Sequence, residues 1–273
     1  MELPIELESH RIVESKIVRT DGGGSSTILF KDEKCKKAKP GQFIMIWIPD
    51  LGEIPMSLSF IDEKGYSGVT LRPFGLASTK LFEAKKGDKL PIRGPYGKPF
   101  TSVKGNVLLV GGGTGLSPLI PMSENLLNAG SKVTLIIAAK NSKELIFAKR
   151  ARNLLNKNNS QVLFVTEDGS MGYKGLATDV AKPLIKEMDM IYTCGPELMM
   201  LSLFNMAKKS KVPIEASLER LMECAIGICG ICSIGKYLVC KDGTVFNSNQ
   251  LKELSSEFGR ASRDSSGTKI FFK

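Results

Sequence analysis

The stretch that decides the fold is GNVLLVGGGTGLSPLIPMSENLLNAG, residues 105–130. It begins with a short apolar run at residues 107–110, passes through a glycine-rich turn, and continues as a helical pattern from about Ser117 and Pro118. An apolar strand that enters a helix through such a turn is the opening of a βαβ unit. We therefore expect parallel strands from this point onward.

Three more apolar runs follow, and helical segments lie between them. The runs are KVTLIIAAK (132–140), QVLFVTED (161–168) and MDMIYTCG (188–195). Strands that alternate with helices at this spacing predict an α/β doubly wound parallel sheet. The sequence thus predicts an α/β domain over residues 103–212.

The residues before this domain show a different pattern, with short apolar runs separated by Gly, Pro, Asp and Lys. The runs are HRIVESKIVR (10–19), SSTILFKD (25–32), FIMIWIPD (43–50), MSLSFID (56–62) and GVTLRPF (68–74), followed by the turn-rich KKGDKLPIRGPYGKPF (85–100). This many short strands predict a closed β-barrel over residues 1–102. Residues 213–273, which carry most of the cysteines and one helical pattern (248–259), are expected to form a small third domain.

The composition is ordinary for a globular protein, with 42% hydrophobic and 24% charged residues in a chain of 273. No apolar run reaches the roughly 18 residues that a membrane span needs. The first residues also lack the apolar segment of a signal peptide. We therefore expect a cytoplasmic protein that does not enter a membrane.

The formal net charge is +10, and the lysines that produce it are scattered along the chain. No aromatic–basic platform or helix-turn-helix pattern accompanies them, so we expect no nucleic-acid binding and interpret the basic surface as a solvated, lysine-rich one that could face an acidic partner. His10 is the only histidine, which argues against histidine-based catalytic triads and histidine-rich metal sites.

Four of the six cysteines are crowded into ECAIGICGICSIGKYLVC, residues 223–240. Cys224, Cys229, Cys232 and Cys240 have the spacing C-x4-C-x2-C-x7-C. The absence of a secretion signal disfavours disulfides. Four thiolates suit zinc, but structural zinc sites usually pair two C-x2-C knuckles, and only one is present here. The C-x4-C-x2-C…C order is that of plant-type 2Fe–2S ligation.

The residues between these cysteines also suit a loop that wraps around a cluster. Ala225, Gly227, Gly230 and Ser233 are small, and the isoleucines at 226, 228 and 231 are apolar enough to exclude water. The spacing therefore favours a 2Fe–2S cluster over zinc and leaves zinc open. Cys35 and Cys194 are too distant in the sequence to be taken as ligands, and we expect Cys35 to lie in a lysine-rich surface loop.

Two glycine-containing turns lie where an α/β sheet binds ligands. The glycines at 111, 112, 113 and 115 either approach a phosphate at a helix N-terminus or serve close packing, and the residues alone leave both open. In YTCGPELMM (192–200), Cys194-Gly195-Pro196 ends a strand and starts a helix at the same side of the sheet. No base accompanies the thiol, so it is expected to make a contact and not to act as a nucleophile.

A barrel followed by GGGTGLSPL and then CGPELMM resembles the ferredoxin–NADP reductase superfamily, in which the barrel binds a flavin and the next domain binds NAD(P)H. The continuation SLERLMECAIGICGIC (217–232) is similar to the electron-transfer subunits of the dihydroorotate dehydrogenase B family. The resemblance covers essentially the whole chain. It implies FAD, one 2Fe–2S cluster bound by the four cysteines, and NAD as cofactors.

The resemblance also implies which residues contact the flavin. They are Pro55, Met56 and Ser57; Leu71, Arg72 and Pro73; Gly75, Ser78 and Thr79; and Gly94 in the turn RGPYGKPF (93–100). The arginine that precedes the Pro-apolar-Ser triplet in the family is Ile54 here. Arg72 is expected to supply the missing charge.

For NAD, the resemblance implies three further groups of residues. Gly112, Gly113, Thr114 and Gly115 are expected on the pyrophosphate side, Cys194, Gly195 and Pro196 near the nicotinamide, and Asp168 at the adenosine end. No side chain of this chain is expected to be catalytic.

The implied function is electron transfer in pyrimidine (UMP) biosynthesis. Dihydroorotate would be oxidised on a separate FMN-containing catalytic subunit, and electrons would reach NAD through the 2Fe–2S cluster and FAD of this chain. The family implies two copies of each subunit. Flavin and iron–sulfur subunits of a hydrogenase, a sulfide-linked reductase or a transhydrogenase remain alternatives, as does a zinc-stabilised binding module on a degenerate reductase fold.

Overall fold

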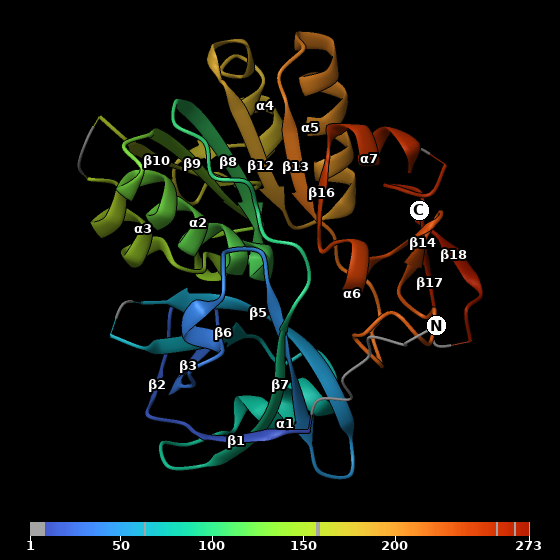
Figure 1. Ribbon diagram of the computed structural model, residues 1–273. Helices are drawn as coiled ribbons and strands as arrows, with labels where there is room; N and C mark the ends of the chain where they lie inside the picture. Colours follow the sequence, from blue (N-terminus) through green and yellow to red (C-terminus); the bar gives the residue numbers. More distant parts are fainter. Residues whose placement is uncertain (1–8, 63, 157–158, 255, 265, 273) are drawn as a thin grey trace.

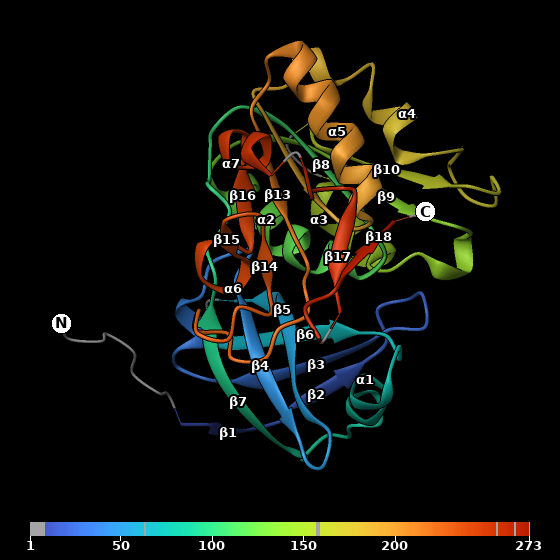
Figure 2. The same cartoon turned by 90° about the vertical axis from the view of Figure 1, so that its right-hand side faces the viewer.

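Two seven-stranded sheets lie one above the other, and the C-terminal part of the chain runs along their flank (Figures 1 and 2). The computed structural model describes residues 9–62, 64–156, 159–254, 256–264 and 266–272. Within these residues, no helix is long and apolar enough to cross a membrane.

The first sheet is antiparallel and has the strand order β1-β7-β4-β5-β6-β3-β2. Its strands are β1 (Arg11–Glu14), β2 (Ile17–Arg19), β3 (Ser26–Lys31), β4 (Phe43–Ile48), β5 (Gly52–Ile61), β6 (Tyr66–Leu71) and β7 (Lys89–Tyr96), with the short helices η1 (Cys35–Lys37) and α1 (Leu76–Phe82) between them. The outermost strands, β1 and β2, follow one another in the chain, and the described residues record no ladder between them. The sheet is therefore a half-barrel, less closed than the sequence predicts.

Alternate residues of these strands fill the half-barrel, because successive side chains of a strand point to opposite faces. Ile28 and Phe30 of β3 meet Ile44 and Ile46 of β4 in one core cluster, and all four are fully buried. Cys35 belongs to the same cluster. Our expectation that Cys35 lies in a surface loop is therefore wrong: the lysines around it are exposed, but the thiol points inward.

The second sheet has the order β11-β10-β9-β8-β12-β13-β16 and is parallel except for β16, which pairs antiparallel with β13. Its elements up to β13 are β8 (Asn106–Gly112), η2 (Gly113–Gly115), α2 (Leu116–Asn128), β9 (Lys132–Ala139), η3 (Ser142–Glu144), α3 (Ala148–Leu155), β10 (Gln161–Thr166), β11 (Tyr173–Lys174), α4 (Ala177–Ala181), η4 (Ile185–Glu187), β12 (Met190–Cys194), α5 (Glu197–Ser210) and β13 (Ile214–Ser217). The predicted doubly wound α/β sheet is confirmed.

Helices cover both faces of this sheet, and each face has its own core. Val107 and Leu109 of β8 belong to the cluster that contains α2 and α3, whereas Leu108 and Val110 belong to the cluster that contains α4 and α5. This is why residues 107–110 form a continuous apolar run and do not alternate with polar residues.

The C-terminal part contacts both sheets. It comprises β14 (Ser233–Ile234), β15 (Tyr237–Leu238), α6 (Val239–Asp242), β16 (Val245–Asn247), α7 (Ser248–Glu253), β17 (Ala261–Arg263) and β18 (Lys269–Phe271). The Thr244 hydroxyl donates to the Gly41 carbonyl of the half-barrel at 2.6 Å, and the next residue begins β16 of the second sheet. The division into 1–102, 103–212 and 213–273 stays a proposal, because β13 and β16 lie beyond residue 212 and still pair within the second sheet.

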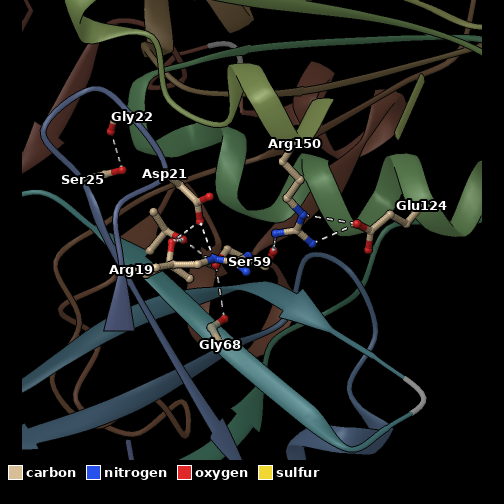
Figure 3. A network of polar contacts seen from close by, with 10 residues as sticks. Arg19, Asp21, Gly22, Ser25, Ser59, Gly68, Glu124 and Arg150 are labelled. Atoms are coloured by element: carbon tan, nitrogen blue, oxygen red, sulfur yellow. Dashed lines mark hydrogen bonds and ion pairs between the residues drawn. The ribbon is translucent and has the colours of Figure 1, made fainter. Parts of the chain in front are cut away.

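One arginine joins the half-barrel to the second sheet's helices (Figure 3). Arg150 of α3 donates to the Ser59 carbonyl of β5 at 2.7 Å and to the Glu124 carboxylate of α2 at 2.9 Å. Its guanidinium also lies over the Phe60 ring, 4.7 Å from the centroid. These contacts tie α3 to the edge of the half-barrel and to α2.

A buried carboxyl anchors the segment that links the two sheets. Glu215 of β13 accepts a hydrogen bond from the Thr101 amide at 2.9 Å, and the Tyr192 hydroxyl donates to the Thr101 carbonyl at 2.7 Å. Burial raises the pKa of Glu215 above its ordinary value of 4.5, and the hydrogen bond offsets only part of that rise. The protonated acid is therefore favoured in the folded protein more than in the unfolded chain.

This linkage predicts how Glu215→Gln affects stability. Because the folded-state pKa is raised, the parent loses stability as pH rises from the unfolded pKa through the folded pKa. Glutamine mimics the protonated acid at every pH. We expect the variant to melt about 2–4 °C above the parent at pH 8 and at the same temperature near pH 4. Melting curves across this pH range would contradict the assignment if the difference did not depend on pH.

Candidate functional site

A cavity of about 240 Å³ lies between the two sheets and is lined by residues from both of them and from the C-terminal part. Six of the residues expected to contact a flavin line it: Pro55, Met56, Ser57, Leu71, Arg72 and Ser78. Thr114, expected on the nucleotide side, lines it as well. The tertiary structure thus brings the two neighbouring strands and the start of α1 together at one place.

The other four expected flavin residues do not line this cavity. Pro73, Gly75 and Thr79 are exposed around the start of α1. Gly94 lies in β7, where its carbonyl accepts a hydrogen bond from Arg11 at 2.7 Å. For these residues a contact with the flavin stays a prediction.

Ser117 is one of several residues of this cavity that were not predicted from the sequence. It lies in the first turn of α2 and is only 3% exposed. Its hydroxyl lines the cavity and finds no hydrogen-bond partner among the residues that the structure describes. A buried hydroxyl without a partner costs about 1–3 kcal/mol, so a polar group of a ligand is expected to pair with it.

A second and larger cavity of about 1040 Å³ lies beside the first. It is lined by Gly112, Gly113, Thr114 and Gly115, and by Gly195 and Pro196 of the turn after β12. Arg72, Glu219 and Arg220 line both cavities. The two cavities therefore adjoin, and both glycine-containing turns open into the larger one.

Gly115 shows why one of these turns needs glycine. A Cβ at this position would lie 2.6 Å from the Cys194 carbonyl oxygen and 2.6 Å from the Gly195 Cα. The turn after β8 and the turn after β12 thus touch through their backbones. The glycine at 115 therefore serves close packing of the two turns, and the two turns together form one wall of the larger cavity.

Two of the expected nucleotide residues do not line this cavity. Cys194 is 1% exposed, and burial raises the pKa of its thiol well above its ordinary value. Asp168 is exposed, and its carboxylate accepts hydrogen bonds from the Ser170 amide and hydroxyl at 2.9 and 2.6 Å. Its neighbour Glu167 lines the cavity in its place.

Two charged residues, Glu219 and Arg220, lie where the two cavities adjoin. Arg220 donates to both carboxylate oxygens of Glu197, at 2.6 and 2.9 Å, and its side chain is 3% exposed. Glu219 lines both cavities. Desolvation of its carboxyl, and then the negative charge of Glu197, raise the pKa of Glu219. Both Glu219 and Arg220 come from SLERLMEC (217–224), a stretch in which the sequence alone predicted no role for either residue.

The four cysteines of the C-terminal part fall into two pairs, and none of them forms a disulfide in the part of the chain described. The Cys224 sulfur accepts hydrogen bonds from the Ile228 and Cys229 amides, each at 3.4 Å. The Cys232 sulfur accepts one from the Cys240 amide at 3.5 Å.

Amide donors and a neighbouring thiol stabilise two of the thiolates. Burial works against the thiolate of Cys224, but backbone N–H groups, chiefly that of Cys229, lower its pKa to about 7. The hydrogen bond with Cys240 lowers the pKa of Cys232 to about 6 and raises that of Cys240. Thiolates are the form in which cysteine binds metals.

The cysteine loop is open to solvent on one side. Cys229 is exposed, and Ile228 and Leu221 have exposed fractions of 59% and 45%. Cys232 and Cys240 are buried. Among the residues described, no three metal-ligating side chains converge on a single point. The hydrogen bonds thus join the cysteines as two pairs, Cys224 with Cys229 and Cys232 with Cys240.

The comparisons with known proteins agree with this geometry. Residues 109–203 match the family profile of the oxidoreductase NAD-binding domain. A chain from the structure of an NADH-dependent reduced ferredoxin-NADP oxidoreductase superposes with a TM-score of 0.77 and 28% identity, covering 90% of this chain and 93% of that one. The FAD/NAD-binding domain of nitric oxide dioxygenase from Vibrio cholerae, at 19% identity, a TM-score of 0.67 and coverage of 75% and 95%, shares the fold. The protein is an oxidoreductase subunit of the ferredoxin reductase class.

The more specific matches lie in the C-terminal part and over the full length. Residues 219–252 match the iron–sulfur cluster binding domain of dihydroorotate dehydrogenase B. The probable dihydroorotate dehydrogenase B (NAD(+)) electron transfer subunit of Methanocaldococcus jannaschii is 37% identical over 277 residues, covering 100% of both chains. Its counterpart in Methanothermobacter thermautotrophicus is 36% identical, covering 99% of this chain and 98% of the other. The chain belongs to the family of dihydroorotate dehydrogenase B electron transfer subunits.

Proposed function

We propose that this chain carries electrons between an FMN-containing dihydroorotate dehydrogenase catalytic subunit and NAD, in the synthesis of pyrimidines. It would do so with a 2Fe–2S cluster on the cysteine loop, FAD in the smaller cavity and NAD in the larger one. The observation that carries the proposal is the convergence of three candidate sites: the two cavities share Arg72, Glu219 and Arg220, and the cysteine loop begins four residues after Arg220.

The cysteines fit a 2Fe–2S cluster. Such a cluster takes four thiolates, two for each iron, and the structure pairs Cys224 with Cys229 and Cys232 with Cys240. Amide groups already point at Cys224 and Cys232, as expected around a cluster that is stabilised by hydrogen bonds to sulfur. The C-x4-C-x2-C order and the match of residues 219–252 to an iron–sulfur cluster binding domain support the cluster over the zinc alternative.

The smaller cavity fits a flavin ring. Pro55 and Met56 offer apolar contacts, Ser57 and Ser117 offer hydroxyls, and Arg72 offers a positive charge. When bound, FAD exchanges a hydride with a nicotinamide and single electrons with an iron–sulfur centre. The residues of this chain hold and orient the ring, shield it from water, and keep a carboxyl, that of Glu219, at the junction with the second cavity.

Ser117 gives this proposal a quantitative test. Ser117→Ala removes the unpartnered hydroxyl, and we expect FAD to bind about five- to tenfold more weakly because one buried hydrogen bond is lost. Ser123→Ala is the matched control: Ser123 is buried in the same helix, but its hydroxyl donates to the Leu119 carbonyl at 2.9 Å. Fluorescence titration of the apoprotein with FAD measures both affinities. Equal affinities for the two variants would contradict the assignment.

The larger cavity fits NAD. The turn at residues 112–115 and the start of α2 present backbone N–H groups to a pyrophosphate. Glu167 lines the cavity with a carboxylate, which is suited to accept hydrogen bonds from ribose hydroxyls and to repel a 2′-phosphate. We therefore assign to Glu167 the adenosine contact that the sequence suggested for Asp168, and we propose NAD over NADP.

The exposed side of the cysteine loop is the proposed contact with the catalytic subunit. Ile228, which precedes Cys229 in the chain, and Leu221, three residues before Cys224, are large apolar side chains on the surface. Covering them with a partner protein would remove apolar area from water and exclude solvent from the cluster. We propose an assembly of two electron-transfer and two catalytic subunits.

Spectra of the purified protein test the proposal. Anaerobically prepared protein is expected to show flavin bands, together with a broad absorbance that dithionite bleaches and two irons per chain by analysis. Colourless protein that contains zinc would overturn it. With the catalytic subunit added, dihydroorotate should reduce the flavin of this chain. Failure of that step with an intact cluster would favour a hydrogenase-type or other reductase partner.

A further inference from the structure

A buried arginine of the half-barrel contacts the cysteine loop. Arg93 of β7 is 9% exposed, and its Nη1 donates to the Cys224 carbonyl at 2.7 Å. Its Nη2 donates to the Glu223 carbonyl at 3.1 Å. One guanidinium therefore binds two successive backbone carbonyls, those of Glu223 and Cys224, at the first cysteine of the loop.

The other side of the same guanidinium is bound to the half-barrel. Nε and Nη2 of Arg93 donate to the two carboxylate oxygens of Glu53 in β5, at 2.7 and 2.5 Å. This pairing raises the pKa of Arg93, so the side chain stays charged. Glu53 also contacts His10 Nε2 at 2.8 Å. The pairing with Glu53 thus holds the Arg93 guanidinium in the orientation in which it contacts the cysteine loop.

Glu53 lies on the strand that lines the smaller cavity. It is two residues before Pro55, so their side chains share one face of β5. Met45 of β4 pairs with Pro55 on one side and with Arg93 on the other. A continuous path of strand pairing and hydrogen bonds therefore joins the wall of the cavity to the Cys224 backbone.

The loop needs such an anchor. Residues 223–230 form neither a helix nor a strand, and Ala225 has a φ of 59°, which an L-residue rarely adopts. The two hydrogen bonds from the planar, charged Arg93 guanidinium restrict the backbone at Glu223 and Cys224.

We propose that Arg93 is a positioning residue for the iron–sulfur cluster. It clamps the backbone of Cys224 to the strand that lines the flavin cavity, and its charge stabilises the cluster after the cluster accepts an electron. The inference rests on the proposed function and assigns to the Arg93–Glu53 pair a role in setting the potential of the cluster. Reduction adds one negative charge, which a nearby cation favours and a nearby carboxylate disfavours.

The test is a redox titration of the flavin- and cluster-loaded subunit, followed by electron paramagnetic resonance. Arg93→Gln leaves Glu53 uncompensated, and we expect the one-electron reduction equilibrium to fall about tenfold, which is about 59 mV. Arg93→Lys keeps the charge and should stay within about threefold of the parent. Glu53→Gln removes the negative charge and should shift the potential in the opposite direction.

The matched control is Arg150→Gln. Arg150 is as buried as Arg93, with side-chain exposures of 12% and 11%, and it too binds a carboxylate and a backbone carbonyl between the two sheets. We expect no shift in the potential of the cluster for this variant. Shifts of opposite sign for the Arg93 and Glu53 variants support the proposal, because general damage to the fold would move both in one direction.

Two outcomes overturn the proposal. One is a potential for Arg93→Gln that equals that of the parent; the other is a fall for Arg93→Lys as large as that for Arg93→Gln. Should Arg93→Gln fail to hold iron, the Lys and Glu53 variants decide. The parent protein separates this inference from the proposed function: a parent without a cluster contradicts the function, whereas a parent that titrates normally beside unshifted variants contradicts only the role of Arg93.

Discussion

Replacing Cys229 by serine is expected to remove the cluster absorbance and to lower dihydroorotate-driven reduction of the flavin at least about a hundredfold. Cys229 is exposed and forms one pair with Cys224, and a serine hydroxyl does not ionise at neutral pH to replace the thiolate. FAD should stay bound, because Cys229 does not line the smaller cavity. Absorbance and iron content of the isolated subunit, and stopped-flow reduction of the assembled one, measure these effects.

Ile228→Ala is the control for this experiment, since it alters the adjacent exposed residue without removing a thiol. The isolated control protein should keep its iron and its absorbance. A Cys229→Ser protein that lost FAD together with the cluster would contradict the separation of the two sites. One that kept two irons per chain would remove Cys229 from the set of ligands.

Arg220→Leu is expected to lower the free energy of unfolding by about 3–5 kcal/mol, because it leaves the Glu197 carboxylate, whose side chain is only 11% exposed, without its partner. The substitution is also expected to weaken the attachment of the C-terminal part, because both residues of the ion pair bind its backbone. Glu197 also accepts a hydrogen bond from the Gly259 amide at 2.7 Å, and Arg220 donates to the Ala261 carbonyl at 3.3 Å. Urea unfolding measured through the single tryptophan would give the difference in free energy.

Two further variants make this result specific. Lys236→Ala breaks an ion pair of similar length, 2.8 Å, whose side chains are 67% and 48% exposed, and should cost less than about 1 kcal/mol. Adding Glu197→Gln to Arg220→Leu should recover part of the loss, because the uncompensated charge is removed while an oxygen remains for the Gly259 amide. A loss below about 1 kcal/mol for Arg220→Leu alone would show that the pair is not the anchor described above.

The sequence predicts well those features that depend on a few neighbouring residues. The apolar run at 107–110 and the helix that follows it were expected, because burial on both faces of a parallel strand leaves a continuous apolar signature. The four cysteines were singled out as candidate ligands because their spacing along one loop is a local property of the sequence. The half-barrel strands were likewise expected from alternation and turn residues.

Other features could not be predicted because they depend on how distant segments pack. Cys35 lies among exposed lysines in the sequence but turns into the core of the half-barrel. Glu167 lines the larger cavity and Asp168 does not, although both residues follow β10. The hydroxyl of Ser117 is notable only once the residues around it are known to offer no partner.

The sequence by itself determined the class of fold and the order of the candidate sites along the chain, and it predicted the four cysteines as the cluster ligands. Periodicity and ligand spacing are properties of the local backbone, so they can be recognised in one dimension. Only the tertiary structure decided which side chains meet between the sheets. Arg93 reaches the Cys224 carbonyl across 131 positions of sequence, and no local pattern encodes such a contact. It exists because the half-barrel, the α/β sheet and the C-terminal part pack against one another in one arrangement.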